Sequence, residues 1–372
     1  MAALNEEQNI IRDQAKAWVS EQAPVTAFRT MRDSKLPLSF QAETWSTMIE
    51  MGWTGILVPE ACGGSDLGYL TFGLILEETG RHLTASPLFS SAYAGVSALR
   101  LAGSDSQQQA LLPKVVDGSA ILTLAVDEGA HHAPAAIMAS AVAGDGGLVL
   151  NGAKQFVMEG MAATHFVVAA RSGDGITLLA VDAGAQGVSR EALSTMDSRG
   201  YANLQFTDVF VPADRVLSEP GMAAGQLETI LDATCAGLSI EMLGTASQAF
   251  DMTLEYLKTR EQFGRVIGSF QALGHRAAEL YTDMELARSC AEAALQAIDA
   301  ESNEAPMLAS LAKCRVGEFL YRMSNELIQM HGGIGMTDEF DAGFYLKRAR
   351  VLEGLFGNRA YHRDRFAQLQ NF

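Results

Sequence analysis

The sequence predicts an α+β protein in which a helical domain, a small β-barrel or β-sandwich and a helical bundle follow one another. Two observations support this order. Apolar residues have helical spacing in both terminal parts and form short strand-like runs in the middle. Turn-forming glycine and asparagine pairs separate those middle runs. The 372 residues therefore divide into three expected domains, at 1–119, 120–216 and 217–372.

The first domain shows its helical spacing most clearly around Phe72. Its mostly apolar positions lie three to four residues apart, as on one face of a helix. They are Phe72, Ile75, Leu76, Thr79 and Leu83. Glu77 and Glu78 fall off this face, so the segment is predicted to be an amphipathic helix.

The middle domain is predicted to consist of short strands joined by tight turns. Gly144–Gly147 has the composition of a turn. His165–Ala170 and Ile176–Val181 are apolar runs that flank Gly173–Gly175, which favours a hairpin. Asn151–Gly152 is a dipeptide typical of hairpin turns, so another turn is expected there.

The third domain is predicted to be a bundle of long helices. Helical spacing extends over about 226–259, 270–299 and 305–331, and a shorter helix follows Asp341. Gly332–Gly333 is expected to end the third long helix, because glycine is common just beyond helix C-termini.

Composition excludes several classes of function. The chain has 27 basic and 44 acidic residues and a net charge of −17, which argues against nonspecific nucleic-acid binding and against anionic membranes. Its apolar runs are too short to span a bilayer, and the acidic start MAALNEEQ does not resemble a signal peptide. Four cysteines without disulfide or metal spacing indicate reduced thiols and a cytoplasmic protein.

Two segments have side chains that suit a nucleotide. Arg260–Gly264 lies between two predicted helices and offers a guanidinium, an amide and an aromatic ring, which fit a pyrophosphate or an adenine. Gln329–Gly335 combines an amide with glycines that let a backbone approach a ligand closely. Taken singly, each segment is better explained as an ordinary interhelical loop or helix end.

Together these segments occur with two further motifs, Gly52–Glu60 followed by Gly63-Gly64-Ser65, and Asp208–Pro212. In this combination the chain resembles the acyl-CoA dehydrogenase family from about Asn5 to about Asp364. The resemblance implies the α–β–α architecture of that family and a bound FAD.

The resemblance also implies a reaction and partners. A carboxylate would remove the proton alpha to the thioester of an acyl-CoA, and the flavin would accept hydride from the beta carbon, leaving a trans-2-enoyl-CoA. Electrons would pass to an electron-transfer flavoprotein. In such enzymes two segments reach across a dimer or tetramer to the partner's FAD. The corresponding residues here are Arg260, Gln262, Phe263, Gln271, Gln329, Gly332 and Gly333.

The usual catalytic base of the family has no evident counterpart. Counted forward from Gly332, the position of the carboxylate is Phe356, whose ring cannot accept a proton. Glu353 lies three residues earlier and is the runner-up candidate for the base. The alternative for Glu353 is a solvated charge beside Arg350.

Some members place the base on the long helix that precedes Arg260, where this chain has Thr234. Glu241 lies seven residues further on, almost two turns along the same face. Its neighbours are small or apolar, so its carboxyl is expected to be desolvated and its pKa raised, as a general base for a weak carbon acid requires. Glu241 is therefore the first candidate for the base. The alternative is a buried glutamate paired with an arginine or a backbone amide.

The segments that touch the flavin ring within the same chain differ from the family pattern. Val126–Ala133 replaces a Thr-Glu-Pro-Gly-Ala-Gly-Ser-Asp segment, and Phe156-Val157-Met158 replaces Trp-Ile-Thr. Phe156 and Met158 remain candidate cofactor contacts: Phe156 can still stack on a ring, whereas Met158 cannot donate a hydrogen bond. His131-His132 is a poor metal signature, and a surface turn is expected there.

Three hypotheses follow from this pattern. The chain is a working dehydrogenase with Glu241 as base, or a flavin-clasping subunit of a hetero-oligomer that acts on bulky acyl-CoA esters, or a non-catalytic scaffold that keeps only the fold. In the second case another acyl-CoA dehydrogenase-like chain supplies the ring pocket.

Overall fold

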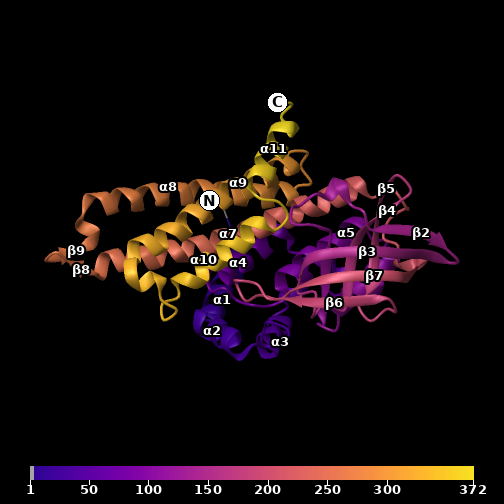
Figure 1. Ribbon diagram of the computed structural model, residues 1–372, viewed down its shortest axis with the longest axis horizontal. Helices are drawn as coiled ribbons and strands as arrows, with labels where there is room; N and C mark the ends of the chain where they lie inside the picture. The colour runs from indigo at the N-terminus through magenta and orange to yellow at the C-terminus, as the bar shows by residue number, and fades with distance from the viewer. Residues whose placement is uncertain (1–3) are drawn as a thin grey trace. The chain divides into compact units, whose positions relative to one another are not determined.

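A computed structural model describes residues 4–372 (Figure 1). Met1, Ala2 and Ala3, which belong to the acidic start considered above, lie outside the described residues. The chain forms two compact units, each built from separate stretches. The helical unit contains the stretch up to residue 29, residues 69–84 and residues 235–372. The strand-containing unit contains residues 30–68 and 85–234.

The helical unit is built on long helices, and the three that were predicted in the C-terminal part are confirmed. Its helices are α1 (Glu6–Gln22), α4 (Gly68–Arg81), α7 (Ala224–Thr259), α8 (Gln271–Asp299), α9 (Ala305–His331), α10 (Ala342–Gly354) and α11 (Arg359–Leu369). Two shorter helices, rather than the single one expected, follow Asp341. A two-stranded hairpin, β8 (Glu261–Gln262) and β9 (Arg265–Val266), joins the C-terminal end of α7 to the N-terminal end of α8 (Figure 1).

Helices α4 and α7 approach each other very closely, and glycines permit the approach. A Cβ atom placed on Gly244 of α7 would lie 2.0 Å from the carbonyl oxygen of Glu77. A Cβ atom on Gly80 of α4 would lie 2.3 Å from the carbonyl oxygen of Glu241. The backbones therefore touch where larger residues would hold them apart.

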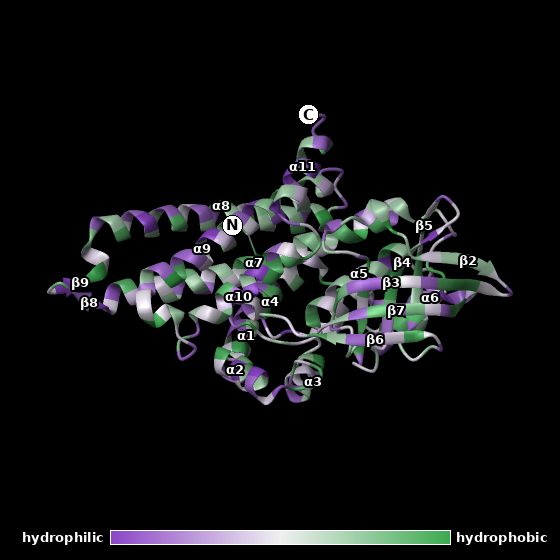
Figure 2. Ribbon diagram, in the orientation of Figure 1, coloured by the Kyte–Doolittle hydropathy of each residue, from purple (hydrophilic) through white to green (hydrophobic). Residues whose placement is uncertain are grey.

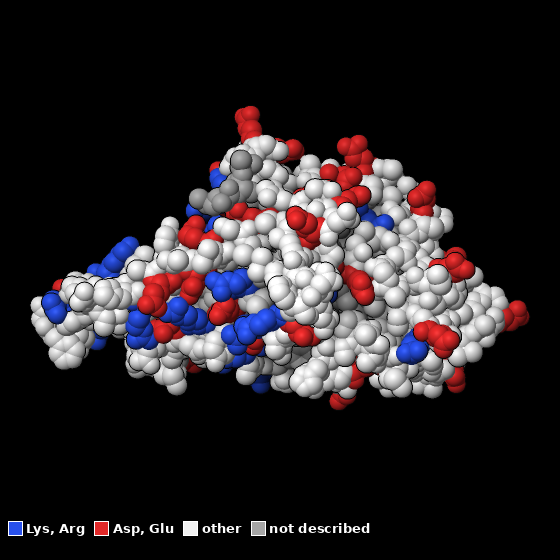
Figure 3. All heavy atoms as spheres, turned by 90° about the horizontal axis from the view of Figure 1, so that it is seen from above, with Lys and Arg blue, Asp and Glu red and all other residues white. Residues whose placement is uncertain are grey.

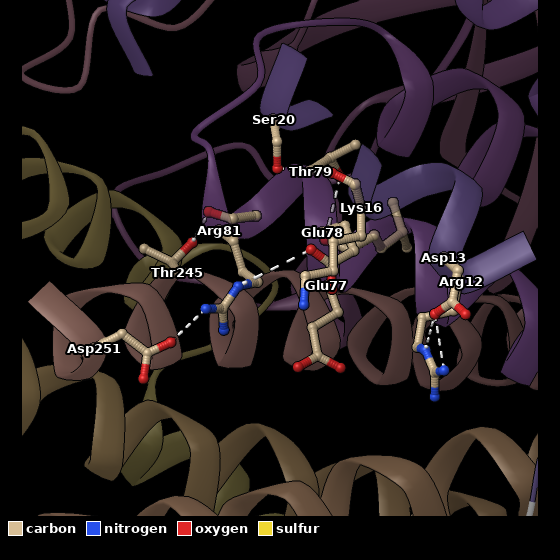
Figure 4. Close-up of polar contacts among 12 residues, drawn as sticks. Arg12, Asp13, Lys16, Ser20, Glu77, Glu78, Thr79, Arg81, Thr245 and Asp251 are labelled. Carbon is tan, nitrogen blue, oxygen red and sulfur yellow. Dashed lines mark hydrogen bonds and ion pairs between the residues drawn. The ribbon is translucent and has the colours of Figure 1, made fainter. Parts of the chain in front are cut away.

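The predicted apolar face of α4 is buried, but Glu78 is buried too. The expectation that Glu78 falls off the buried face is therefore wrong. Its side chain lies near Arg81, which pairs with Asp251 of α7 (Figure 4). Burial raises the pKa of the Glu78 carboxyl, and Arg81 offsets part of that effect. Helix α4 is covered on more than one side, and one apolar stripe cannot reveal that.

The strand-containing unit holds a curled seven-stranded sheet. Its strands are β1 (Leu122–Ala125), β2 (Ser140–Gly144), β3 (Gly147–Met158), β4 (His165–Ser172), β5 (Gly175–Asp182), β6 (Val188–Leu193) and β7 (Tyr201–Pro212). The strand order is β1-β4-β2-β3-β7-β6, with β5 paired to β4. Alternate side chains fill its core, among them Phe166, Leu179 and Phe206. The predicted β architecture is confirmed.

Two of the three predicted tight turns are present. Gly144 pairs with Gly147 across the β2–β3 turn, and Ser172 pairs with Gly175 across the β4–β5 turn. The hairpin turn predicted at Asn151–Gly152 is wrong, because both residues lie inside β3. The β3–β7 register shifts there, and Gly152 has φ +136°. A β-bulge uses the same residue types as a hairpin turn.

Shorter helical segments complete the strand-containing unit. They are α3 (Ala42–Glu50), α5 (Val96–Ala102), α6 (Asp105–Val116), the π-helical segment Leu88–Gly95 and η5 (Ala213–Arg215), while the residues of α2 (Val25–Ser34) are divided between the two units after Arg29. Asn5 and Ser104 cap α1 and α6 with reciprocal side-chain bonds, which explains why those helices begin where they do.

The surface carries mixed charge despite the net excess of acid. On the face drawn in Figure 3, acidic side chains are spread widely and several basic ones lie directly beside them. Ion pairs such as Arg322–Asp283, 2.8 Å, join α8 to α9. Within residues 4–372, no helix is both long and apolar enough to cross a membrane. The four cysteines are free thiols.

Candidate functional site

The corner between α7 and α8 presents the first predicted nucleotide-binding group. Arg260, Gln262 and Gln271 are all exposed, and the ring of Phe263 is 91% exposed. Phe263 and Gly264 have left-handed backbones, so the chain turns sharply between β8 and β9. The ribbon at β8 and β9 is coloured mostly as hydrophilic (Figure 2). The Phe263 ring meets the Phe270 ring edge-on, with centroids 6.2 Å apart, and most of its surface stays open.

The end of α9 presents the second predicted group. Gly332, with φ +63°, ends the helix as the sequence predicts, and Gln329 and Gly333 are exposed beside it. A Cβ atom on Gly332 or Gly333 would meet nothing within 4 Å, so a ligand can approach this backbone.

A ring stack brings these two groups together. Tyr256, one turn before Arg260, stacks on His331, immediately before Gly332, with ring centroids 4.3 Å apart. The His331 imidazole is buried and its Nδ1 lies 2.7 Å from the Leu327 carbonyl oxygen. Burial lowers the pKa of His331, so a neutral ring links the two segments. The sequence places these segments about 70 residues apart and gives no local signal of this stack.

The exposed donors fit the nucleotide half of FAD. Among residues 4–372 the Arg260 guanidinium has no hydrogen bond or ion pair, so its donors are available for a pyrophosphate. The side chain of Gln329 and the open glycine backbone add donors and acceptors beside it. We call Arg260, Gln262, Phe263, Gln271, Gln329, Gly332 and Gly333 the nucleotide clasp.

Glu241, the first candidate for the base, is buried in the middle of α7 and paired. Its Oε1 lies 2.6 Å from Nη2 of Arg348 on α10, and both side chains are more than 90% buried. The structure thus shows the arrangement that the sequence left open as the alternative, a buried glutamate with an arginine partner.

Glu353, the runner-up, is only partly buried, and it pairs with Arg359 at 2.8 Å rather than with Arg350. Phe356 is buried with a left-handed backbone, φ +51°, and its carbonyl oxygen lies 2.9 Å from Nε2 of His362. The turn that carries the usual base in the family therefore offers no carboxylate at Phe356.

A buried lysine holds that turn in place. Nζ of Lys313 donates to the carbonyl oxygens of Leu352, Glu353 and Gly357 at 3.3, 3.1 and 2.9 Å. Burial lowers the pKa of Lys313 to about 8. A cation that satisfies carbonyls at the end of α10 explains why this turn is fixed without an acidic partner.

The altered ring-facing segment lies in the strand-containing unit. Phe156 sits in a β-bulge with φ +57°, and its 40% exposed ring stacks on Tyr201, with centroids 4.4 Å apart. Strained backbone of this kind collects at functional sites. The Met158 side chain is buried, and its carbonyl oxygen accepts a bond from Thr123, 2.8 Å.

A buried ion pair shapes the loop beside Phe156. Lys154 donates to Oε1 of Glu128 at 2.7 Å, and Glu128 also accepts the backbone N–H groups of Met138 and Ala139. Burial opposes ionisation of Glu128, but these bonds outweigh it and hold the pKa of Glu128 below its usual range. A cavity of about 480 Å³ opens here, lined by Glu128, Gly129, His131 and several alanines.

The paired histidines behave differently from each other. His131 is exposed, as a surface turn predicts. The imidazole of His132 is 3% exposed, and its Nδ1 lies 2.8 Å from Oδ1 of Asp127, so the surface expectation is wrong for His132. The buried imidazole–carboxylate contact anchors this loop from within.

Several residues that build the site were not found from the sequence. Arg348, Tyr201 and Lys313 lie far along the chain from the groups they contact, so local patterns do not reveal them. Lys154 is a charged residue at a buried position of β3. A charged residue is rarely fully buried without a partner, so it could have pointed to an ion pair.

Comparison with known proteins covers nearly the whole chain. The models for the acyl-CoA dehydrogenase N-terminal, middle and C-terminal domains match residues 5–119, 123–209 and 225–369. Acyl-CoA dehydrogenase FadE27 of Mycobacterium tuberculosis is 31% identical over 333 residues, 87% of this chain and 86% of that protein.

Two solved structures are close in both sequence and shape. A variant of the Tcur3481–Tcur3483 steroid ACAD is 31% identical, with a TM-score of 0.90 and coverage of 98% of each chain. The ChsE4–ChsE5 complex of Mycobacterium tuberculosis is 27% identical, with a TM-score of 0.92 and coverage of 100% of this chain and 99% of that chain. The chain therefore belongs to the acyl-CoA dehydrogenase family of FAD-dependent oxidoreductases.

Proposed function

We propose that this chain takes part in the α,β-dehydrogenation of an acyl-CoA thioester to the trans-2-enoyl-CoA, with electrons passed to an electron-transfer flavoprotein. The observation that carries the proposal is the nucleotide clasp, whose donors are exposed and gathered by the Tyr256–His331 stack. Bound FAD supplies the two-electron acceptor. Free thiols agree with a cytoplasmic location.

In this proposal the chain's residues bind and orient. Arg260 neutralises the pyrophosphate, while Gln329 and the Gly332–Gly333 backbone hold the adenine end. Phe263 packs on the nucleotide as an aromatic cover. Phe156 presents its open ring face to a planar group in the strand-containing unit, with Tyr201 supporting the other face.

Glu241 is the proposed base of a chain that works alone or as a homo-oligomer. Arg348 fixes the direction of the Glu241 carboxylate. A general base must be both ionised and within reach of the proton it removes. In this homo-oligomeric version, substrate binding must separate Glu241 from Arg348 before Glu241 removes the proton alpha to the thioester.

The Glu241–Arg348 ion pair also favours a second candidate function. If Glu241 stays bound to Arg348, the base comes from another chain, and this chain serves as the flavin-clasping subunit of a hetero-oligomer. Each of the two solved relatives above carries a pair of chain names, and one of them is described as a steroid ACAD. A bulky acyl-CoA ester is the substrate we propose for this version.

Flavin content tests the proposal. The chain is purified alone, and again after coexpression with a second chain of the family from the same source, and the absorption spectrum is recorded. Flavin bound by the chain alone, and bleached by an acyl-CoA under anaerobic conditions, supports the homo-oligomeric version. Flavin gained only in the pair supports the hetero-oligomeric version. A chain that never acquires flavin overturns both.

A further inference from the structure

A small pocket lies in the strand-containing unit where β4 begins and where β5 and β7 end. Its volume is about 190 Å³, the room of roughly six water molecules. Its apolar walls come from Ala180, Val181, Phe210 and Pro212, and the ring of Phe210 is 50% exposed at the lip. None of the residues assigned above to FAD or to the base lines this pocket.

Arg215 lines the pocket and has unused hydrogen-bonding capacity. Its Nη1 is buried, yet it has no hydrogen-bond partner in the part of the chain that the structure describes. A buried guanidinium N–H without an acceptor is costly, and such groups in native proteins point to an ion or water outside the chain. The geometry therefore calls for an acceptor at Arg215.

His165 lies in the same wall and is the second polar group. Thr164 Oγ1 lies 2.9 Å from its Nδ1, which leaves Nε2 for the pocket. Burial lowers the pKa of His165, and the charges of Arg215 and Lys114 lower it further against the opposing carboxylate of Asp182. The imidazole is therefore neutral at pH 7.

Lys114 adds a second cation beside the pocket. Gln107 on α6 donates to the carbonyl oxygens of Asp214 and Val216, at 3.0 and 2.8 Å, on either side of Arg215. Lys114 follows Gln107 by seven residues and so lies on the same helix face. Asp117, which also interacts with Lys114, accepts the Ser119 backbone N–H at 2.8 Å.

One carboxylate lines the pocket beside Arg215. Asp182 lines the pocket, and its Oδ1 accepts the N–H of Gly184 at 2.7 Å. Among the lining residues Arg215 and Asp182 carry opposite charges, while Lys114 is exposed outside the lining and interacts with Asp117. Asp182 repels a monoanion less than it would repel a phosphate dianion, so a monoanion is the better match for Arg215. The apolar walls suit a short carbon tail.

We propose that this pocket binds a small monocarboxylate, with the carboxylate on Arg215 and the tail against Phe210. The site is separate from the proposed dehydrogenation, so its test does not depend on flavin or on turnover. It gives the strand-containing unit a ligand of its own, different in size and charge from an acyl-CoA.

Fluorine NMR of 4-fluorobenzoate with the full-length chain tests this proposal, with neutral 4-fluorobenzamide as the matched probe. Saturable binding of the acid, with at least tenfold weaker binding of the amide, is the expected result. Arg215→Met should weaken binding of the acid about tenfold or more, whereas Arg171→Met, at the far end of β4, should leave it unchanged. Ala185→Phe, which fills the pocket but keeps Arg215, should also abolish binding.

Three outcomes would overturn the proposal: no saturation by 10 mM acid, equal binding of acid and amide, or equal binding by the Arg215→Met and Arg171→Met variants. Displacement of 4-fluorobenzoate by inorganic phosphate at lower concentration than by acetate would overturn the choice of a monoanion. Thermal melting of each variant shows that the comparison is made between folded chains, and Ala185→Phe keeps the test valid if Arg215→Met melts early.

Discussion

Glu241 and Arg348 are 107 residues apart in the chain, yet their side chains meet at 2.6 Å in a buried position. Such a pair can have two separable roles. It can hold helices α7 and α10 together, and it can orient Glu241 as a general base. Removing one partner leaves the other charge buried and unpaired, whereas removing both charges does not. Single and double substitutions therefore separate the structural role from the chemical one.

Glu241→Gln and Arg348→Gln should each lower the free energy of unfolding by about 3–5 kcal/mol, and the double variant should recover most of that loss. If Glu241 is the base, the double variant should still turn over about 10²–10⁴-fold more slowly than the wild type at unchanged flavin content. Urea unfolding and steady-state rates give the two readouts. Wild-type turnover in the double variant would remove Glu241 from the mechanism.

Lys313 predicts an unusual dependence of stability on pH. Its pKa is about 8 in the folded chain, against about 10.4 in an unfolded one, so the unfolded chain holds more protons between these values. The free energy of unfolding therefore rises as pH increases from about 8 to about 10.4, and this gain is lost again as pH falls back to 8. The effect is on the order of 3 kcal/mol.

Urea unfolding of the wild type and of Lys313→Met between pH 7 and pH 10.5 measures this effect as the difference between the two chains. The difference should move in favour of the wild type as pH rises. Lys258→Met, which changes an exposed lysine on α7, is the control and should show no such trend. A flat difference for Lys313→Met would contradict the buried, depressed lysine.

Among the helices, the contact of α4 with α7 depends on the absence of side chains at two positions. Gly244→Ala should destabilise the chain by about 1–3 kcal/mol or more, because the added methyl group would overlap the Glu77 carbonyl oxygen. Gly274→Ala on α8 has open space around it and should be neutral or stabilising by up to about 1 kcal/mol. Thermal or urea unfolding compares the two, and equal effects would rule out the close approach.

The helices and most turns followed from the sequence because their signals are local. Apolar spacing located α7, α8 and α9 nearly to the residue, and Gly332 marked the end of α9. Asn151–Gly152 misled because a bulge inside β3 needs the same small, permissive residues as a turn. The local sequence indicates the backbone conformation that a residue prefers. It does not indicate which strand pairs with that residue, so it cannot distinguish a turn from a bulge.

The parts of the candidate site that the sequence left undetermined depend on distant partners. The small and apolar neighbours of Glu241 predicted its burial. They left open whether it is a general base or a buried glutamate with a partner such as Arg348. Glu78 was misplaced because its helix is buried on more than one side. The residues of the nucleotide clasp were proposed because their types are unusual for a helix corner, and their role stays a prediction, while the Tyr256–His331 stack that gathers them gave no local signal.

For the whole molecule, the exposed clasp predicts a change in protease sensitivity. Chymotrypsin should cut the free chain after Phe263, whose ring is 91% exposed in a sharp turn. FAD together with the appropriate partner chain should slow that cut at least tenfold, because the clasp would then be covered. Riboflavin, which lacks the pyrophosphate and adenine, should give no protection. Mass spectrometry identifies the cut, and equal cleavage with FAD and with riboflavin would argue against the clasp.

The helical unit is assembled from three separate stretches of chain, and this limits how the protein can be dissected. Residues 235–372 include much of α7 and all of α8 to α11, but α1 and α4 of the same unit come from before residue 85. A gene fragment that begins after the strands would lack α1 and α4, expose the surfaces that they cover, and aggregate. Two complementary fragments, cut near residue 85 and made together, would instead restore every missing face, so this chain is better suited to split-protein reassembly than to isolation of its parts.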